Sequence, residues 1–349
     1  MNSQGSKARG SKRKDSPGSG RPFQPPTQTI AALPSNPAFV YALRTVTEAA
    51  ARAVFDWIGR GDKEQGDGAA VDAMREALIR IGLNGSVVIG EGAKDEAPEL
   101  YNGEVFGNAD DPNAFDIAVD PVEGTGYMAK GMSNSMAVIA VAPRGSLFNP
   151  GPAFYMDKFA APPAARGKID PEAPVADKLS ALAKALGKKV NELTIYVLEK
   201  PRHKELIAAI YNSGARVNLH TAGDVAGALM AAMPDSGVDA LMGTGGTPEG
   251  VISACAIRAL GGEFMGRLDP QLPSEKAAVL KVGLNTLRWY GRDELVNSDH
   301  VFFCATGITS GMLFEGVERG PGQEKTQTLV ITGHAHERML ITAYHDRDE

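Results

Sequence analysis

The feature that most constrains the fold is an alternation of helical and strand-like patterns in the second half of the chain. Segments with apolar residues at helical spacing are followed by short apolar runs typical of strands, and the connections between them are short. The expected helices are 177–186, 203–211, 224–233 and 249–260, and the expected strands are 193–198, 216–219 and 238–242. Such a succession is typical of α/β proteins.

Further elements are expected on both sides of this alternation. A helix is expected to begin at Asn36 and Pro37, where a polar cap and a proline precede apolar residues at helical spacing, and a second helix is expected after Gly68. Strands are expected at 86–89, 115–119, 136–141, 301–305, 327–331 and 339–344. Residues 157–174 are rich in proline and glycine, and we expect them to cross the surface between two possible lobes, 36–175 and 176–349, of one domain.

The first 35 residues differ in composition from the rest. They consist largely of Gly, Ser, Pro, Lys and Arg, and we expect a disordered basic tail because they cannot bury enough apolar surface to offset the entropy of ordering. A transit peptide is the alternative, since acidic residues are scarce there. Without the tail, 30 of the 36 basic groups and 41 of the 42 acidic groups remain, a net charge of −11. This acidic body argues against a nucleic-acid-binding domain and suits a protein that binds divalent cations.

Composition also indicates a compartment. No apolar run approaches the roughly 20 residues of a membrane span, and the N-terminus lacks the apolar core of a secretory signal. The two cysteines, Cys255 and Cys304, form neither a metal-binding spacing nor a disulfide framework, so a reducing compartment is the default. We therefore expect a cytoplasmic protein with no membrane partner.

The most informative motif runs from Asp116 to Thr125. An apolar strand delivers Asp120 at its end, Pro121 is expected to end the strand, and a glycine permits a tight turn, so that Asp120, Glu123 and Thr125 converge. Two carboxylates and a hydroxyl at the end of a strand are suited to a hard cation such as Mg²⁺ or Mn²⁺, which substrate phosphate and water would complete. The alternative interpretation is an acidic surface turn.

Two further carboxylates have a similar context. Glu91 lies between Gly90 and Gly92, which would let the backbone approach a ligand closely. Asp67 precedes Gly68 at an expected helix start, where it is either a metal ligand or an N-cap. Carboxylates from separate elements around metal ions would clamp the attacking water and the leaving oxygen of a phosphoryl transfer.

A glycine-rich stretch and several cations complete the candidates. Residues 243–250 are expected to form a turn between a strand and a helix, where free backbone amides would favour a phosphate or a sugar oxygen. Lys200, Arg202 and Arg267 are candidate cations for a phosphorylated substrate, with solvated loop charges as the alternative. Tyr155 either binds a sugar or phosphate oxygen or packs.

Several motifs occur together in one order. They are Trp57-Ile58-Gly59-Arg60-Gly61-Asp62-Lys63, Ile89-Gly90-Glu91-Gly92 with Asp95-Glu96-Ala97-Pro98, Asp120-Pro121-Val122-Glu123-Gly124-Thr125, Lys200-Pro201-Arg202-His203, Pro248-Glu249-Gly250 and Ala305-Thr306-Gly307-Ile308-Thr309. In these motifs the chain resembles the class II fructose-1,6-bisphosphatases, including the bifunctional fructose/sedoheptulose-bisphosphatases. The resemblance covers residues 42–267 and resumes at 298–331.

The resemblance implies a fold, an activity and roles for named residues. The implied fold is the layered α/β/α/β/α sandwich of the lithium-sensitive sugar and inositol phosphatases, and the implied activity is hydrolysis of the 1-phosphate of fructose 1,6-bisphosphate in gluconeogenesis or the Calvin cycle. Water would attack in line, without a covalent enzyme intermediate. The implied cofactor is Mn²⁺ or Mg²⁺, and a homo-oligomer, a dimer or tetramer, is expected.

The implied site residues fall into three groups. The metal ligands would be Asp67, Glu91, Asp120, Glu123 and Glu249. The catalytic residues would be Thr125, which helps to orient and activate the water, Asp95 as a nearby carboxylate and Lys63 as a supporting cation. The substrate contacts would be Glu123, Gly124, Thr125, Tyr155, Lys200, Pro201, Arg202, Asp224 and Gly246.

The chain departs from the family pattern at two places. Ala222-Gly223-Asp224 stands where the family usually has Asp-Gly-Asp, so one sugar-facing carboxylate is missing, and residues 268–293 are shorter than the family's usual segment. The first departure leaves open a sedoheptulose-1,7-bisphosphatase or an inositol-phosphate phosphatase of the same fold. A non-catalytic regulator that binds sugar phosphates is the alternative from another functional class.

Overall fold

Three separate clusters of buried apolar side chains determine the layers of the fold. The computed structural model describes Met1 and residues 37–92, 99–108, 110–335 and 337–347. Within these residues, one cluster joins helices α1 (Pro37–Ala53) and α2 (Lys63–Arg80) to one face of an eight-stranded sheet. A second cluster fills both sides of α6 (Asp224–Ala232) and α7 (Thr247–Leu260), which lie between this sheet and a six-stranded sheet.

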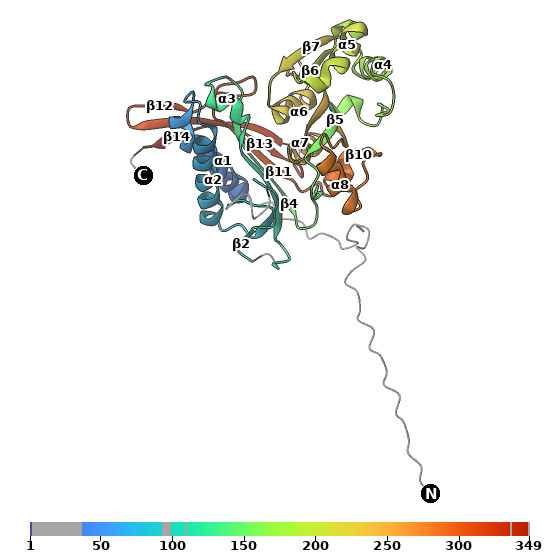
Figure 1. The fold of residues 1–349 in the computed structure, drawn as a ribbon. Helices are drawn as coiled ribbons and strands as arrows, with labels where there is room; N and C mark the ends of the chain where they lie inside the picture. The colour runs from blue at the N-terminus through green and yellow to red at the C-terminus, as the bar shows by residue number, and fades with distance from the viewer. Residues whose placement is uncertain (2–36, 93–98, 109, 336, 348–349) are drawn as a thin grey trace.

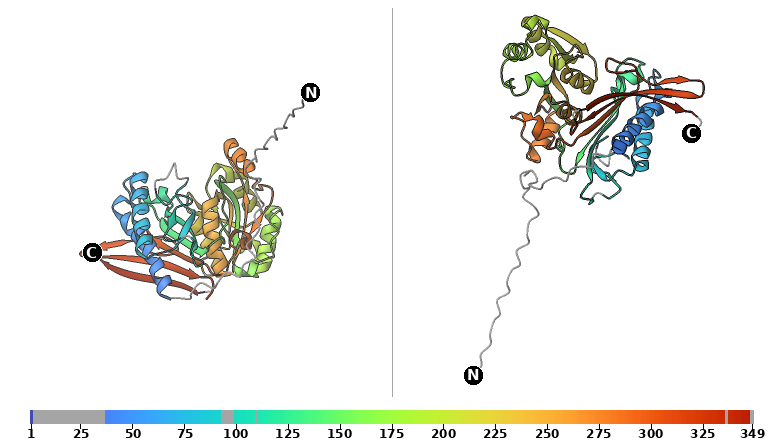
Figure 2. Two further views of the ribbon diagram at one scale, coloured as in Figure 1. Left: turned by 90° about the horizontal axis from the view of Figure 1, so that it is seen from below. Right: turned by 180° about the vertical axis from the view of Figure 1, so that it is seen from behind.

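The third cluster completes the sandwich. It packs α4 (Val175–Leu186) and α5 (Lys204–Asn212) against the outer face of the six-stranded sheet. The result is an α/β/α/β/α sandwich, with α1 and α2 at one side and α4 and α5 at the other (Figure 1). The order of the layers is also visible from below in the left view of Figure 2. The expected fold class is therefore confirmed.

The chain enters the eight-stranded sheet twice. The order is β12-β13-β11-β4-β3-β1-β2, with β14 added beside β13, and only β1 and β3 are parallel. Its strands are β1 (Gly85–Ile89), β2 (Val105–Phe106), β3 (Phe115–Glu123), β4 (Met136–Pro143), β11 (Phe302–Gly307), β12 (Glu318–Gly320), β13 (Gln323–Thr332) and β14 (Glu337–Asp346).

Residues between these two parts of the chain form the six-stranded sheet. Its order is β10-β9-β5-β8-β6-β7, with β6 parallel to β7 and β8. Its strands are β5 (Tyr155–Ala161), β6 (Thr194–Leu198), β7 (Arg216–His220), β8 (Ala240–Gly246), β9 (Glu263–Leu268) and β10 (Tyr290–Gly291). The division between the sheets thus does not coincide with the expected lobes 36–175 and 176–349.

Short helices complete the described fold, and most expected elements are present. The short helices are α3 (Thr125–Ala129), α8 (Pro273–Lys281) and α9 (Arg292–Leu295). The expected surface crossing at 157–174 is wrong in its first part, because Tyr155–Ala161 is a central strand whose side chains are buried on both faces of its sheet. Of the expected tail, residues 2–35 lie outside the described residues.

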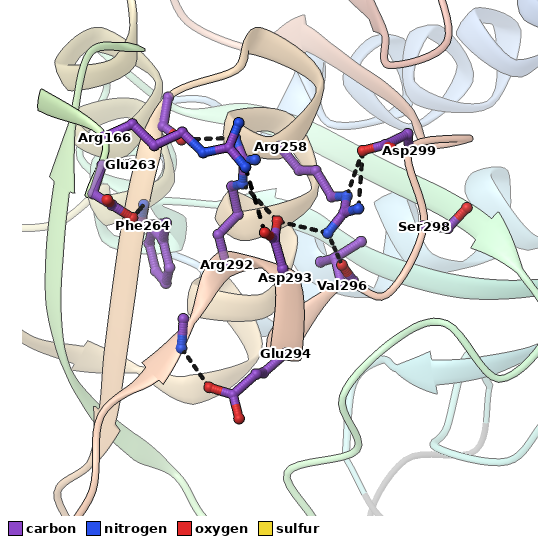
Figure 3. Close-up of polar contacts among 12 residues, drawn as sticks. Arg166, Arg258, Glu263, Phe264, Arg292, Asp293, Glu294, Val296, Ser298 and Asp299 are labelled. Carbon is purple, nitrogen blue, oxygen red and sulfur yellow. Dashed lines mark hydrogen bonds and ion pairs between the residues drawn. The ribbon is translucent and has the colours of Figure 1, made fainter. Parts of the chain in front are cut away.

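An ionic cluster ties α7 and α9 together at one end of the sandwich. Figure 3 shows the guanidinium groups of Arg166, Arg258 and Arg292 directed at Asp293, at 2.7–3.4 Å. Arg258 also binds Asp299 and the carbonyl of Val296. Because these arginines are bonded to protein acceptors, we assign the cluster a structural role.

Among the described residues, no helix is both long and apolar enough to cross a bilayer.

Candidate active site

A cavity of about 420 Å³ lies where β3, α2, α6, β8 and α7 meet. Most of the residues predicted for the site line it. These are Asp67, Glu91, Asp120, Glu123, Gly124, Thr125, Lys200, Arg202, Asp224, Gly246 and Glu249.

The end of β3 brings two carboxylates to the same side of the strand. Residues three positions apart in a regular strand face opposite ways. In β3, however, Asp120 pairs with Val138 and Glu123 with Met136, so one extra residue on β3 forms a bulge. Both carboxylates therefore share a face. The expectation that Pro121 ends the strand is wrong, because the bulge accommodates the proline and pairing resumes at Glu123.

The turn after β3 is built for a helix start. Gly124 has a φ of +79°, a left-handed conformation that glycine adopts without strain. Thr125 then begins α3, and its hydroxyl donates to the carbonyl of Val122 at 3.0 Å. The amide of Val122 in turn donates to Asp120 Oδ1 at 3.1 Å. These bonds fix the motif around the cavity.

Helix α7 adds a third carboxylate. One ligand oxygen each of Asp120, Glu123 and Glu249 lies within 4.8 Å of the others. Glu249 Oε2 is buried and has no hydrogen-bond partner among the described residues. A Cβ on Gly246 would lie 1.8 Å from that same oxygen, so the absence of a side chain at Gly246 makes room for it. An unpartnered buried carboxylate oxygen indicates a site that a cation would complete.

The pKa values of these three carboxylates are raised. Burial raises the pKa of Asp120 well above its usual range, and neighbouring carboxylates, Glu123 first, raise it further. Burial, followed by the charges of Asp224 and Glu249, raises the pKa of Glu123 to about 8. Burial and then Asp224 also raise the pKa of Glu249. A divalent cation among these oxygens would oppose all three shifts.

Two more carboxylates extend the acidic cluster. Burial raises the pKa of Asp67, and burial followed by the charge of Asp67 raises that of Glu91 to about 8. Hydrogen bonding between the two side chains opposes the rise in the pKa of Asp67 and adds to the rise in that of Glu91. Glu91 is held by its amide, which donates to the carbonyl of Leu100 at 3.0 Å, and a Cβ on Gly90 would clash with that carbonyl oxygen at 1.9 Å.

The alternative role of Asp67 as an N-cap is wrong. Helix α2 begins earlier than expected, at Lys63, and Asp62 caps it by accepting a hydrogen bond from the amide of Gln65 at 3.1 Å. Asp67 lies within the helix and lines the cavity. The sequence pattern misplaced the helix start because Gly66 and Gly68 are unfavourable in a helix interior.

Two cations line the same cavity as the acidic cluster. Lys200 and Arg202 follow β6, and both line the cavity. The Arg202 guanidinium donates to the carbonyl of Thr244 at 2.7 and 3.0 Å and lies 5.3 Å from the ring centroid of Tyr155. Arg267, in contrast, pairs with Asp157 at 3.1 Å and is not among the lining residues.

The glycine-rich stretch differs from the expected phosphate-binding turn. Residues 243–246 continue β8, and the helix starts directly at Thr247. The amide of Thr244 donates to His203 Nε2 at 2.8 Å, and that of Thr247 donates to the carbonyl of Phe154 at 2.9 Å. These amides are thus already bonded within the protein. Pairing with β5, which local sequence does not encode, explains the longer strand.

Among the described residues, three of the predicted site residues do not line the cavity. The ring of Tyr155 packs against the guanidinium of Arg202, and Pro201 starts a short 3₁₀ turn. Lys63 is exposed at the first turn of α2. Asp95 lies outside the described residues.

Sequence reasoning missed Lys158. This lysine of β5 is 2% exposed and forms an ion pair with Asp224. Its signal in the sequence is weak. Lys158 follows Asp157 in a segment whose other residues, Met156 and 159–161, are apolar, and a charged side chain is not expected to be buried there without a partner.

Comparisons with known proteins cover most of the chain. Residues 38–345 match the family described as bacterial fructose-1,6-bisphosphatase, glpX-encoded. The class 2 fructose-1,6-bisphosphatase 1 of Escherichia coli K12 is 44% identical over 316 residues, which cover 87% of this chain and 94% of that protein. A class 2 fructose-1,6-bisphosphatase of Shigella flexneri matches with the same figures. Among solved structures, the extragenic suppressor protein suhB of Bartonella henselae is 13% identical with a TM-score of 0.31, covering 56% of this chain and 73% of that one.

Proposed function

The chain belongs to the glpX-encoded family of bacterial fructose-1,6-bisphosphatases, and we propose that it hydrolyses the 1-phosphate of fructose 1,6-bisphosphate to fructose 6-phosphate and phosphate. The observation that carries this proposal is the meeting of Asp120, Glu123 and Glu249 in a cavity that Lys200 and Arg202 also line. A cavity lined by both carboxylates and cations suits a phosphate ester bound together with divalent cations.

We propose Mn²⁺ or Mg²⁺ as the cofactor, held by Asp67, Glu91, Asp120, Glu123 and Glu249. Carboxylate oxygens are the ligands that these hard cations prefer, and the unpartnered Glu249 Oε2 supports their fit. When bound, such a cation supplies Lewis-acid stabilisation of the charge on the phosphoryl oxygens.

The chain's own residues would bind the substrate and orient the water. The Thr125 hydroxyl donates a hydrogen bond to the carbonyl of Val122, and its oxygen can therefore accept a hydrogen bond from the attacking water. Lys200 and Arg202 would neutralise the charge that spreads over the phosphoryl oxygens. Asp95 and Lys63 stay in the proposal as further catalytic groups.

The full set of proposed substrate contacts includes residues already named above. They are Glu123, Gly124, Thr125, Tyr155, Lys200, Pro201, Arg202, Asp224 and Gly246. Support comes from the cavity, which most of these residues line. Tyr155 would contribute through Arg202, over which its ring lies.

The proposal is tested by phosphate release from the purified protein. Fructose 1,6-bisphosphate, sedoheptulose 1,7-bisphosphate and inositol 1-phosphate are each supplied with Mn²⁺, Mg²⁺ or chelator. We expect metal-dependent release from the first substrate. Release from inositol phosphate alone would contradict the proposed substrate, and binding without release from any of the three would favour the regulator.

One observation favours sedoheptulose 1,7-bisphosphate as a second substrate. Ala222 lines the cavity with a small apolar side chain, while its backbone is held by the hydroxyls of Tyr127 and Tyr196 at 3.0–3.3 Å. At this position only a methyl group projects from the cavity wall, which leaves more room for a substrate than a larger side chain would. Comparable release from the fructose and sedoheptulose substrates would support this second activity.

We also propose a homo-oligomer, a dimer or tetramer, in the cytoplasm. The edge strand β14 supports an assembly, because Leu340 and Tyr344 are 52% and 65% exposed on it. The two cysteines are free thiols, which fits a reducing compartment. Light scattering on the purified chain tests the assembly, and a monomer at micromolar concentration would contradict it.

A further inference from the structure

A buried lysine lies next to the cavity, in contact with the lining residue Asp224. Lys158 occupies β5 between β8 and β9, and its ammonium group forms an ion pair with Asp224 Oδ2. It is among the largest fully buried side chains of the described protein. Burying an ammonium group is costly unless a partner compensates its charge, so this position requires the carboxylate.

Two glycines make room for the ion pair. A Cβ on Gly245 would lie 1.9 Å from Asp224 Oδ2 and 3.2 Å from Lys158 Nζ. A Cβ on Gly250 would lie 3.2 Å from Lys158 Cε. Since one glycine comes from β8 and the other from α7, two separate elements keep space for the contact.

Asp224 connects this ion pair to the cavity. It is the first residue of α6, is 7% exposed and lines the cavity. Lys158 binds its Oδ2, whereas its Oδ1 has no hydrogen-bond partner among the described residues. The next amide, that of Val225, donates to Glu123 Oε1 at 2.9 Å. The start of α6 is therefore anchored at Asp224 and at the residue that follows it.

We propose that Lys158 is a positioning residue for substrate recognition: by binding one oxygen of Asp224, it directs the other toward a hydroxyl group of the sugar bisphosphate. The inference rests on the proposed function, in which Asp224 contacts the sugar. An ion pair fixes the carboxylate more firmly than packing alone, because a free Asp side chain would rotate about its terminal torsion. Lys158 itself does not line the cavity.

The test compares Lys158→Met with Lys168→Met, which makes the same chemical change at an exposed position. We expect Lys158→Met to raise KM for fructose 1,6-bisphosphate by about tenfold or more, with a smaller change in kcat, because a charge-assisted hydrogen bond is lost. Mn²⁺ binding, measured by calorimetry without substrate, should not weaken, because the change removes a positive charge from the neighbourhood of the acidic cluster. Lys168→Met should leave KM and kcat unchanged.

A double mutant separates positioning from a general structural role. If Lys158 acts through Asp224, Asp224→Asn should raise KM by a similar factor, and the double variant should be no worse than the worse single variant. Multiplying effects, or Mn²⁺ binding that weakens in step with the rise in KM, would overturn the inference. If the wild-type protein does not hydrolyse fructose 1,6-bisphosphate, the proposed function itself is contradicted.

A second variant covers the case in which Lys158→Met does not fold. Gly245→Ala retains both charges but places a methyl group where Asp224 Oδ2 lies. We expect a rise in KM of the same order with Mn²⁺ binding retained. An unchanged KM in a folded Gly245→Ala protein would contradict the positioning role.

Discussion

At the residue scale, the site concentrates negative charge inside the protein. Asp120, Glu123 and Glu249 meet within 4.8 Å, and burial raises the pKa of each. Like charges in a buried site destabilise the folded protein unless protons or cations neutralise them. We therefore expect these carboxylates to be required for activity and, in the metal-free protein, to lower the stability of the fold.

Glu123→Gln tests this opposition. We expect kcat to fall by at least about 100-fold. Replacing a residue that only supports a metal ligand already lowers activity about 10–100-fold, and Glu123 is a proposed ligand itself. At pH 8.5, above the raised pKa of Glu123, the unfolding temperature of the metal-free variant should rise, because one buried charge has been removed. Thermal unfolding in chelator and phosphate release in Mn²⁺ measure the two effects, with exposed Glu337→Gln as the matched control. A variant with full activity would exclude Glu123 from the site.

The pH dependence of stability follows from the same shifts. The pKa values of Glu91 and Glu123 are raised from 4.5 to about 8 in the folded protein, so between these pH values the folded state binds more protons than the unfolded state. Stability of the metal-free protein should therefore fall as pH rises through that range, by up to about 1.4 kcal/mol per pH unit for each group.

Urea unfolding in chelator from pH 5 to 8.5 measures this slope. Histidines of lowered pKa, such as His203 and His220, act in the opposite direction below their usual value of 6.5. The difference between wild type and Glu123→Gln isolates the carboxylate. The gap between them should widen as pH rises, and saturating Mn²⁺ should abolish it. A gap that is constant with pH would contradict the shifted titration.

At the element scale, helix α2 has the N-cap Asp62 and carries the site residue Asp67. Asp62 accepts a hydrogen bond from the amide of Gln65, and Asp67 follows within the same helix. We expect Asp62→Ala to lower the free energy of unfolding by about 0.5–2 kcal/mol, the usual cost of losing an N-cap. Asp62→Asn, which keeps a capping oxygen, should cost much less. Equal losses in urea unfolding would show that the cap does not explain the effect.

The elements also show how far the sequence predicts this fold. The helices 224–233 and 249–260 were expected within two residues of α6 and α7, because their apolar spacing and flanking glycines are local signals. β3 and β8 both run further than expected. A bulge at Pro121 and pairing of residues 243–246 with β5 depend on partners distant in sequence, which no local pattern encodes.

The candidate site shows the same limit. Asp120, Glu123 and Thr125 were predicted to converge because they share one motif, and all three line one cavity. Lys158 was missed, because residues 157–174 were expected to cross the surface, where a lysine side chain is ordinarily exposed. Only the tertiary structure brings it to Asp224.

At the scale of the whole molecule, the layer of α6 and α7 sets the distance between the two sheets. Gly227 of α6 packs against Tyr196 of β6, whose hydroxyl donates to the carbonyl of Gly223 at 2.8 Å beside the cavity. Packing in this layer therefore reaches the wall of the site. The division of strands between the sheets, with β11–β14 returning to the first, was not predictable because it depends on non-local pairing.

Gly227→Ala tests this coupling. A Cβ there would lie 2.4 Å from Tyr196 Cδ1, and the ring is fully buried and stacked on that of His220. We expect the free energy of unfolding to fall by about 1–3 kcal/mol, the usual cost of overpacking, together with a loss of activity. Gly68→Ala, at a helical glycine with open space, should stabilise by about 0.5–1 kcal/mol. Equal stability of both variants would contradict the packing argument.

The account's central claim is that the end of β3 and the start of α7 hold the divalent cation of a sugar bisphosphatase. Anomalous diffraction from crystals soaked in Mn²⁺ and fructose 6-phosphate tests it most directly. The account predicts an anomalous peak within bonding distance of Asp120, Glu123 and Glu249, with the sugar beside Asp224. A peak elsewhere, in crystals of protein that releases phosphate with Mn²⁺, would contradict it.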